Sequence, residues 1–184
     1  MTYYGKLTGG TGDVNPQWYR GTLTMTAPNI ASTLAFISPI GKGIAAKTGS
    51  ATVMEVLKVQ FILPILSGVG AGAETVRFRT VGLSTRDHAT THLQGEEPDI
   101  IAYHTDSSVG AFTALQGYHL QVWATVEKDL TDGAGHGVLV ATDYIYFQGD
   151  TDGFAAEGKF SFGILYRFKN VKLVEYIGIV QSQQ

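Results

Sequence analysis

Two histidines and a few aspartates are the residues of this chain whose spacing could support chemistry. His88 and His92 lie four residues apart in HATTH, and on a helix this spacing would place two imidazoles on one side, as a metal site requires. The segment is rich in Thr, has no Glu between the histidines, and is followed by Gly95 and Pro98, with no evident third ligand. These features favour a loop with two exposed histidines, and we expect no metal site and no cofactor.

Asp150 and Asp152, in the sequence GDTDG, resemble half of a calcium-binding loop. Calcium takes about six to eight oxygen ligands, and the Glu that completes an EF-hand loop is missing here. Asp side chains also cap their own backbone in turns, so the pattern favours a turn. A cation shared between subunits at this turn is the alternative.

Asp132 and His136 stand in the glycine-rich sequence DGAGHG. An aspartate that orients a histidine could provide a general base, but hydrolysis also needs a nucleophile and an oxyanion donor. The chain has no Cys and no Gly-x-Ser-x-Gly motif, and the glycines indicate a tight turn between strands. We therefore predict no catalytic residues and a protein that is not an enzyme.

Two pairs of basic residues could contact phosphate groups. Arg77 and Arg79 share one face of an expected strand, and Arg167 and Lys169 share one face of another. If these strands lie in one sheet, the pairs form a modest cationic patch suited to nucleic acid. The alternative is that each pair is the solvent side of a half-buried strand. The chain has a net charge of -3, so any binding to free nucleic acid should be weak and salt-sensitive.

The composition indicates a protein that buries much of its surface against other subunits. Of 184 residues, 44% are hydrophobic and only 16% are charged, whereas about 25% is usual for charged residues in soluble domains. Neutral surface is the kind that buries well between subunits. The longest apolar stretch, Val53–Leu66, contains Glu55, Lys58, Gln60 and Pro64 and is too polar to span a bilayer, so we expect no membrane partner.

The elements that position these residues all have the pattern of strands. Period-two, β-branched or aromatic segments end at Gly, Pro, Asn, Asp or Thr, and no helical pattern alternates with them. The expected strands are Trp18–Ala27, Ala31–Ile40, Ala51–Leu66, Glu74–Ser84, Ile100–Thr105, His119–Lys128, Val138–Gln148, Lys159–Lys169 and Lys172–Val180. The sequence predicts an all-β fold, an eight-stranded antiparallel jelly-roll sandwich with Greek-key connections. Residues 1–17 are expected to form a flexible N-terminal arm, and residues 18–184 a single jelly-roll domain.

Alternating positions of the long strands should build the core. In the strand at 51–66, Val53, Glu55, Leu57, Val59 and Phe61 are expected on one side. The expected core residues are Val53, Leu57, Val59, Phe61, Val122, Val126, Ile145, Phe147, Phe162, Ile164 and Tyr166.

Three segments resemble a family of viral proteins: Val53–Pro64 (VMEVLKVQFILP), Leu130–Gln148 (LTDGAGHGVLVATDYIYFQ) and Ile164–Gln184 (ILYRFKNVKLVEYIGIVQSQQ). They are similar to the single jelly-roll capsid proteins of small circular Rep-encoding single-stranded DNA viruses. The resemblance implies a virion protein that assembles with itself into an icosahedral shell, T=1 in its simplest form, around circular single-stranded DNA. Such capsid proteins carry an Arg/Lys-rich arm, whereas residues 1–18 here contain only Lys6. Genome contact would then fall to wall residues, with Arg77, Arg79, Arg167 and Lys169 as candidates.

Three other functions remain open at this stage. The first is a different viral structural protein: a decoration protein, a tail-tube protein or a capsid subunit over an internal membrane. The second is a carbohydrate-binding module with Trp18, Tyr103 and Trp123 as stacking residues. The third is a cupin-like enzyme, although the five histidines lack the close H-x-H spacing that it needs.

Overall fold

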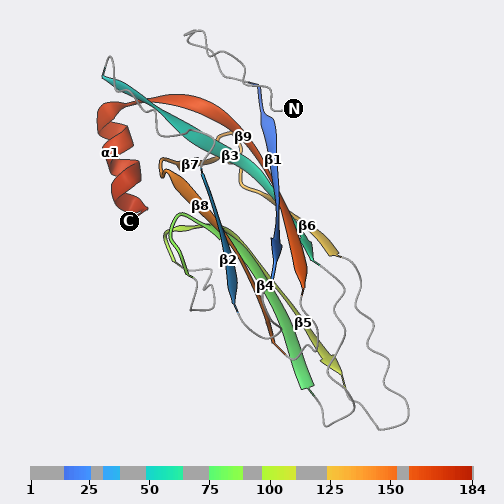
Figure 1. Ribbon diagram of the computed structural model, residues 1–184. Helices are drawn as coiled ribbons and strands as arrows, with labels where there is room; N and C mark the ends of the chain where they lie inside the picture. Colours follow the sequence, from blue (N-terminus) through green and yellow to red (C-terminus); the bar gives the residue numbers. More distant parts are fainter. Residues whose placement is uncertain are drawn as a thin grey trace, which may run out of the picture.

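Two antiparallel sheets form a sandwich in the computed structural model, which describes residues 15–25, 31–37, 49–63, 75–88, 97–110, 124–152 and 158–183 (Figure 1). The first sheet has the order β1-β9-β3-β6, with the short β7 also paired to β3, and the second has the order β2-β8-β4-β5. The strands are β1 (Gln17–Thr24), β2 (Ser32–Ile37), β3 (Ser50–Leu63), β4 (Thr75–Ser84), β5 (Ile100–Gly110), β6 (Ala124–Asp129), β7 (Val138–Val140), β8 (Tyr144–Asp152) and β9 (Lys159–Lys172). One helix, α1 (Leu173–Ser182), follows β9.

The pairing of strands is that of a ribbon folded over on itself. With β7 set aside, β1 pairs with β9, β2 with β8, β3 with β6, and β4 with β5, always antiparallel. Such pairing from the outside inwards produces the two Greek keys of a jelly roll. The predicted antiparallel jelly-roll sandwich is confirmed, with β7 as an additional short strand. Residues 1–14 of the predicted arm lie outside the described residues.

Aromatic rings from both sheets fill the space between them. Phe162 on β9 contacts Phe147 on β8 and Phe36 on β2, with ring centroids 4.4 and 5.2 Å apart. Seven of the predicted core residues belong to this main core: Val59, Phe61, Ile145, Phe147, Phe162, Ile164 and Tyr166. Val126 packs against it partly buried, and Val122 lies outside the described residues.

A β-bulge in β3 corrects the predicted alternation of that strand. The register with β9 shifts between Val56 and Lys58, so Met54 and Val56 face the main core before the shift, and Val59 does so after it. One extra residue reverses which side chains point inward. Val53 is therefore buried on the opposite face of the sheet, in a second cluster, and does not share a side with Val59.

The end of the chain was predicted as a strand at Lys172–Val180, and this prediction is wrong: Leu173–Ser182 is helical. Its apolar residues were taken for a period of two, but Tyr176, Ile179 and Val180 have helical spacing and pack on the second cluster. That cluster consists of Ala51, Val53, Ala141 and Val171. Figure 1 shows α1 beside the end of the first sheet where β3, β7 and β9 meet. Within the described ranges, no helix is both long and apolar enough to cross a membrane.

The predicted strand Val138–Gln148 is in fact two strands in different sheets. β7 pairs with β3 in the first sheet, and β8 pairs with β2 and β4 in the second. The polar residues Thr142 and Asp143 lie at the crossing between them. The alternation of apolar and polar residues does not reveal this crossing, because β7 and β8 are both extended and the change of sheet leaves the pattern of a strand on either side.

Candidate functional site

The two predicted basic pairs lie on different sheets. Arg77 and Arg79 belong to β4 in the second sheet, and Arg167 and Lys169 belong to β9 in the first. The condition for a single cationic patch, that both strands share one sheet, is therefore not met. Each pair has to be considered in its own surroundings.

Arg167 and Lys169 hold a buried carboxylate between them. Glu55 lies opposite Arg167 in the β3–β9 ladder and is fully buried. The Arg167 Nε atom donates to Glu55 Oε2 at 2.5 Å, and Lys169 Nζ donates to Oε1 at 3.4 Å. The backbone N–H of Gly137 donates to the same Oε1 at 3.2 Å. The three side chains form an ion triad on the outer face of the first sheet, with one net positive charge.

The triad keeps its carboxylate ionised. Burial raises the pKa of Glu55, but the hydrogen bonds from Arg167 and Gly137 and the positive charges of Lys169 and Arg167 together outweigh it. The pKa of Glu55 is therefore lowered from its ordinary value of 4.5. Sequence analysis placed Glu55 within a strand and missed this role, because its two cationic partners lie more than 110 positions further along the chain.

The turn at 132–137 covers the triad. Asp132 accepts hydrogen bonds from the backbone N–H groups of Ala134 and His136, and Gly135 has a positive φ of 82°. The Gly135 carbonyl accepts from Arg167, and a Cβ atom at Gly137 would overlap the carbonyl oxygen of Val56. The predicted tight turn is thus confirmed. The Asp132–His136 contact closes this turn on an exposed surface.

Arg79 is a buried residue rather than an exposed one. Its side chain is 3% exposed and pairs with Asp106, its partner in the β4–β5 ladder. The backbone of Arg77 lies opposite Ser108, and the side chain of Arg77 is outside the described part of the structure. A buried guanidinium paired with a carboxylate is less available to phosphate than a free one.

A basic residue that sequence analysis did not propose lies on the same face as the triad. Arg20 on β1 is exposed, and its guanidinium carbon lies 5.2 Å from the centre of the Trp18 ring. β1 pairs with β9, and Arg20 lies opposite Gly163, four positions from Arg167 along β9. The alternation that places Trp18, Arg20 and Thr22 on one side of the strand could have identified Arg20 as an exposed basic residue. Arg20 was not proposed because it is a single arginine, whereas the proposed residues occur in pairs.

His88 contradicts the prediction of an exposed histidine. It is buried, its Nε2 lies 2.6 Å from Asp99 Oδ2, and its Nδ1 lies 3.4 Å from Glu97 Oε2. Glu97 and Asp99 follow His88 by nine and eleven residues, where the chain returns to begin β5. Motifs with ligands three or four residues apart therefore did not connect them with His88. His92 lies outside the described residues.

Asp150 and Asp152 also depart from their prediction, since both belong to β8 and not to a turn. They lie opposite Thr80 and Phe78 in the ladder with β4, and Asp150 is buried. Pairing with β4 on one side extends the strand through residues that favour turns in isolation.

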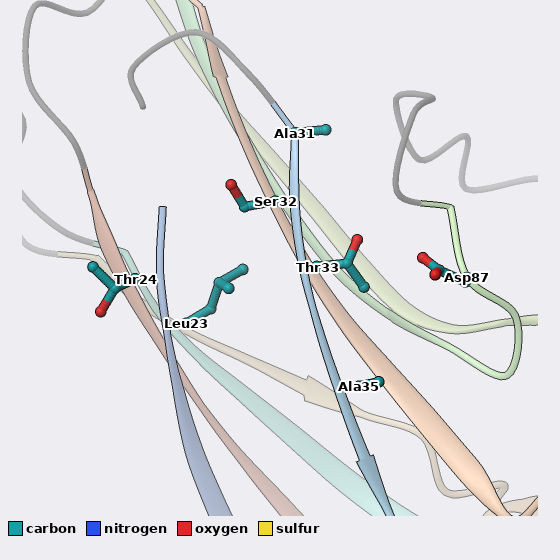
Figure 2. Close-up of a pocket in the computed structure, with 7 residues that line it drawn as sticks. All are labelled: Leu23, Thr24, Ala31, Ser32, Thr33, Ala35 and Asp87. Carbon is teal, nitrogen blue, oxygen red and sulfur yellow. The ribbon is translucent and has the colours of Figure 1, made fainter. Parts of the chain in front are cut away.

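A pocket of about 360 Å³, lined by both apolar and polar side chains, lies between the two edge strands β1 and β2 (Figure 2). Its lining consists of Leu23, Thr24, Ala31, Ser32, Thr33, Ala35 and Asp87. Figure 2 shows Thr33 pointing from β2 toward the side on which Asp87 lies. The hydroxyl groups and the carboxylate could form hydrogen bonds with a small polar molecule.

Of the comparisons with known proteins, only the one with solved structures found similar chains. No protein-family model and no curated protein matches the chain. Among solved structures it is similar to VP1 of the Trichodysplasia spinulosa-associated polyomavirus in complex with 3′-sialyllactose, at 13% identity and a TM-score of 0.55, over 88% of this chain and 97% of that one. It is also similar to the unassembled pentamer of Merkel cell polyomavirus VP1, at 10% identity and a TM-score of 0.52, over 90% and 99%. At these identities the likeness shows a shared jelly-roll fold.

Proposed function

We propose that this chain is a viral capsid protein whose copies assemble into an icosahedral shell around a small nucleic-acid genome. The observation that carries the proposal is the jelly-roll pairing of β1 with β9, β2 with β8, β3 with β6 and β4 with β5. The similarity of the fold to polyomavirus VP1 over 88% of this chain supports it. The simplest form of the shell is T=1, and its place is the virion. No catalytic function is part of this proposal.

The surface of the subunit supports assembly with further copies. Charged residues are few, and several large apolar side chains are exposed: Trp18, Tyr144, Leu173, Val174 and Ile177. Three of these, Leu173, Val174 and Ile177, lie in the first half of α1. Each subunit of a shell contacts several neighbours. The area that one subunit buries in all its contacts should therefore exceed the roughly 800 Å² that each partner buries in a single standard interface.

The genome in this proposal is single-stranded DNA, as in the small circular Rep-encoding viruses that the strand segments resemble. The candidate contacts remain Arg77, Arg79, Arg167 and Lys169, and the exposed Arg20 is added to them. Among the described side chains, Arg167 and Lys169 are better placed than Arg79, because they reach the outer face of the first sheet together with Arg20. Binding per subunit should be weak, and repetition over the shell would supply the avidity.

Negative-stain electron microscopy and light scattering of the purified protein test the proposal. Uniform closed particles are the expected result, and nucleic acid recovered from them should be protected from nuclease. A monomer of about 20 kDa that persists across a range of salt and pH would overturn the proposal (the chain mass is 19.7 kDa). A carbohydrate-binding module would give that second result.

A further inference from the structure

His88, Glu97 and Asp99 converge where the chain leaves β4 and returns to begin β5. The backbone holds them in place: Thr85 N–H donates to the Asp99 carbonyl at 2.9 Å, and Ile100 N–H donates to the Glu97 carbonyl at 3.1 Å. The side-chain amide of Gln148 on β8 donates to the carbonyl of His88 at 2.6 Å. The ligand atoms of the three side chains all lie within 4.8 Å of one another.

The buried carboxylate of Asp99 fixes the orientation of the imidazole. Its Oδ2 lies 2.6 Å from His88 Nε2, and both side chains are more than nine-tenths buried. A carboxylate acceptor at this distance places the proton on Nε2, so the lone pair of Nδ1 points to the other side of the ring. A carboxylate that orients a histidine in this way is the usual arrangement behind a metal-binding imidazole.

The distance on the other side of the ring fits a metal ion better than a hydrogen bond. Nδ1 of His88 lies 3.4 Å from Glu97 Oε2, which exceeds the usual hydrogen-bond range of about 2.7–3.2 Å. A tetrahedral zinc ion, with bonds of about 2.0–2.2 Å to nitrogen and oxygen, holds two of its ligand atoms about 3.3–3.6 Å apart. The two atoms are therefore spaced for one ion to lie between them.

We propose that His88 Nδ1 and Glu97 Oε2 bind a divalent transition-metal ion of the zinc class, with Asp99 as the residue that positions the histidine. Imidazole and carboxylate together suit Zn²⁺. The Glu97 side chain is 39% exposed, so the ion can enter from solvent and water completes its coordination. The proposal departs from the sequence-based expectation of no metal site and does not depend on the capsid function.

Isothermal titration of the purified chain with ZnSO₄ at pH 7.5 tests the site. We expect one ion per chain and a higher melting temperature in the presence of zinc. Glu97→Gln should remove binding, and Asp99→Asn should weaken it by about 10- to 100-fold. Glu175→Gln, at an exposed carboxylate in the first turn of α1, is the control and should bind as the parent does.

The competing arrangement is an imidazolium held between two carboxylates without any ion. In that case the folded parent shows no heat of binding and no shift in melting temperature with zinc, and the metal proposal is wrong. Equal zinc binding by the parent and by Glu97→Gln would also overturn it. Glu97→Gln should remain folded because its side chain reaches solvent, and circular dichroism checks this.

Discussion

Glu55→Gln should destabilise the subunit at neutral pH, because it leaves two cations around a buried position without their carboxylate. The amide keeps the size of the side chain and can still accept one hydrogen bond. It loses the charge that Arg167 and Lys169 face at 2.5 and 3.4 Å. The substitution therefore tests charge pairing with little change in packing.

The size of the effect depends on how well the cations can be rehydrated. Removing one partner of a fully buried ion pair costs about 3–5 kcal/mol, and a hydrogen bond to a charged group contributes about 1.5–3 kcal/mol. Here Arg167 and Lys169 are 21% and 32% exposed, so water can partly replace Glu55. We expect a loss of about 2 kcal/mol in the free energy of unfolding, which is about 1 M in the urea midpoint at an m-value of about 2 kcal/mol per molar.

The loss should depend on pH in a known direction. The pKa of Glu55 is lower in the folded protein than its ordinary value of 4.5. Its contribution to stability is therefore complete above the unfolded pKa and disappears as the pH falls through the folded pKa. The difference between parent and Glu55→Gln should be constant from pH 7 to about pH 5 and should shrink below pH 4.5.

Urea unfolding followed by circular dichroism, repeated along this pH series at one protein concentration, measures the effect. Glu127→Gln is the matched control, since Glu127 accepts hydrogen bonds from Lys58 and Gln60 on an exposed surface and should lose much less stability. A Glu55→Gln variant as stable as the parent at pH 7 would refute the reasoning. A loss that is the same at pH 3 and pH 7 would show that packing, and not charge, is responsible.

Four further outcomes are expected. Phe162→Ala should cost roughly 3–5 kcal/mol in urea unfolding, because its buried ring packs against the rings of Phe36 and Phe147 in the core. Gly137→Ala should destabilise the fold measurably in the same assay, since the new methyl group would overlap the Val56 carbonyl. Val174→Lys, at a side chain that is 83% exposed, should change stability by less than about 0.5 kcal/mol but reduce particle yield in electron microscopy if α1 lies between subunits. Arg20→Gln combined with Lys169→Gln should lower the nucleic-acid content of purified particles, measured by the ratio of absorbance at two wavelengths, while particles still form.

The sequence predicted the sheets better than it predicted the sites. Period two in strands such as β9 reports directly which face is buried, and Phe162, Ile164 and Tyr166 are in the core as expected. The bulge in β3 was missed because a single added residue leaves no clear signal in the local sequence. The helix after β9 was missed because the spacing of its apolar residues fits both a strand and a helix in so short a segment.

The candidate sites depended on pairs of charged residues that are far apart in the sequence and meet only through the pairing of strands. Glu55 binds Arg167 only because β3 and β9 are neighbours, and Arg79 is buried only because Asp106 on β5 lies opposite to it. Turn chemistry within a few residues, as at Asp132–His136, was predictable because both partners lie in the same short segment.

The position of β8 and β9 within their sheets has a consequence for how the chain is made. β9 lies between β1 and β3, and β8 lies between β2 and β4, so each sheet receives a central strand from residues 144–172. While a ribosome is still adding these residues, β1 and β2 have no neighbour in their sheets and β3 and β4 each have an open edge, a state prone to pairing with other chains. Loop closure between such distant strands is also slow. We therefore expect the two sheets to close only after β9 has left the ribosome, and the subunit to benefit from a chaperone that shields strand edges until β9 is in place.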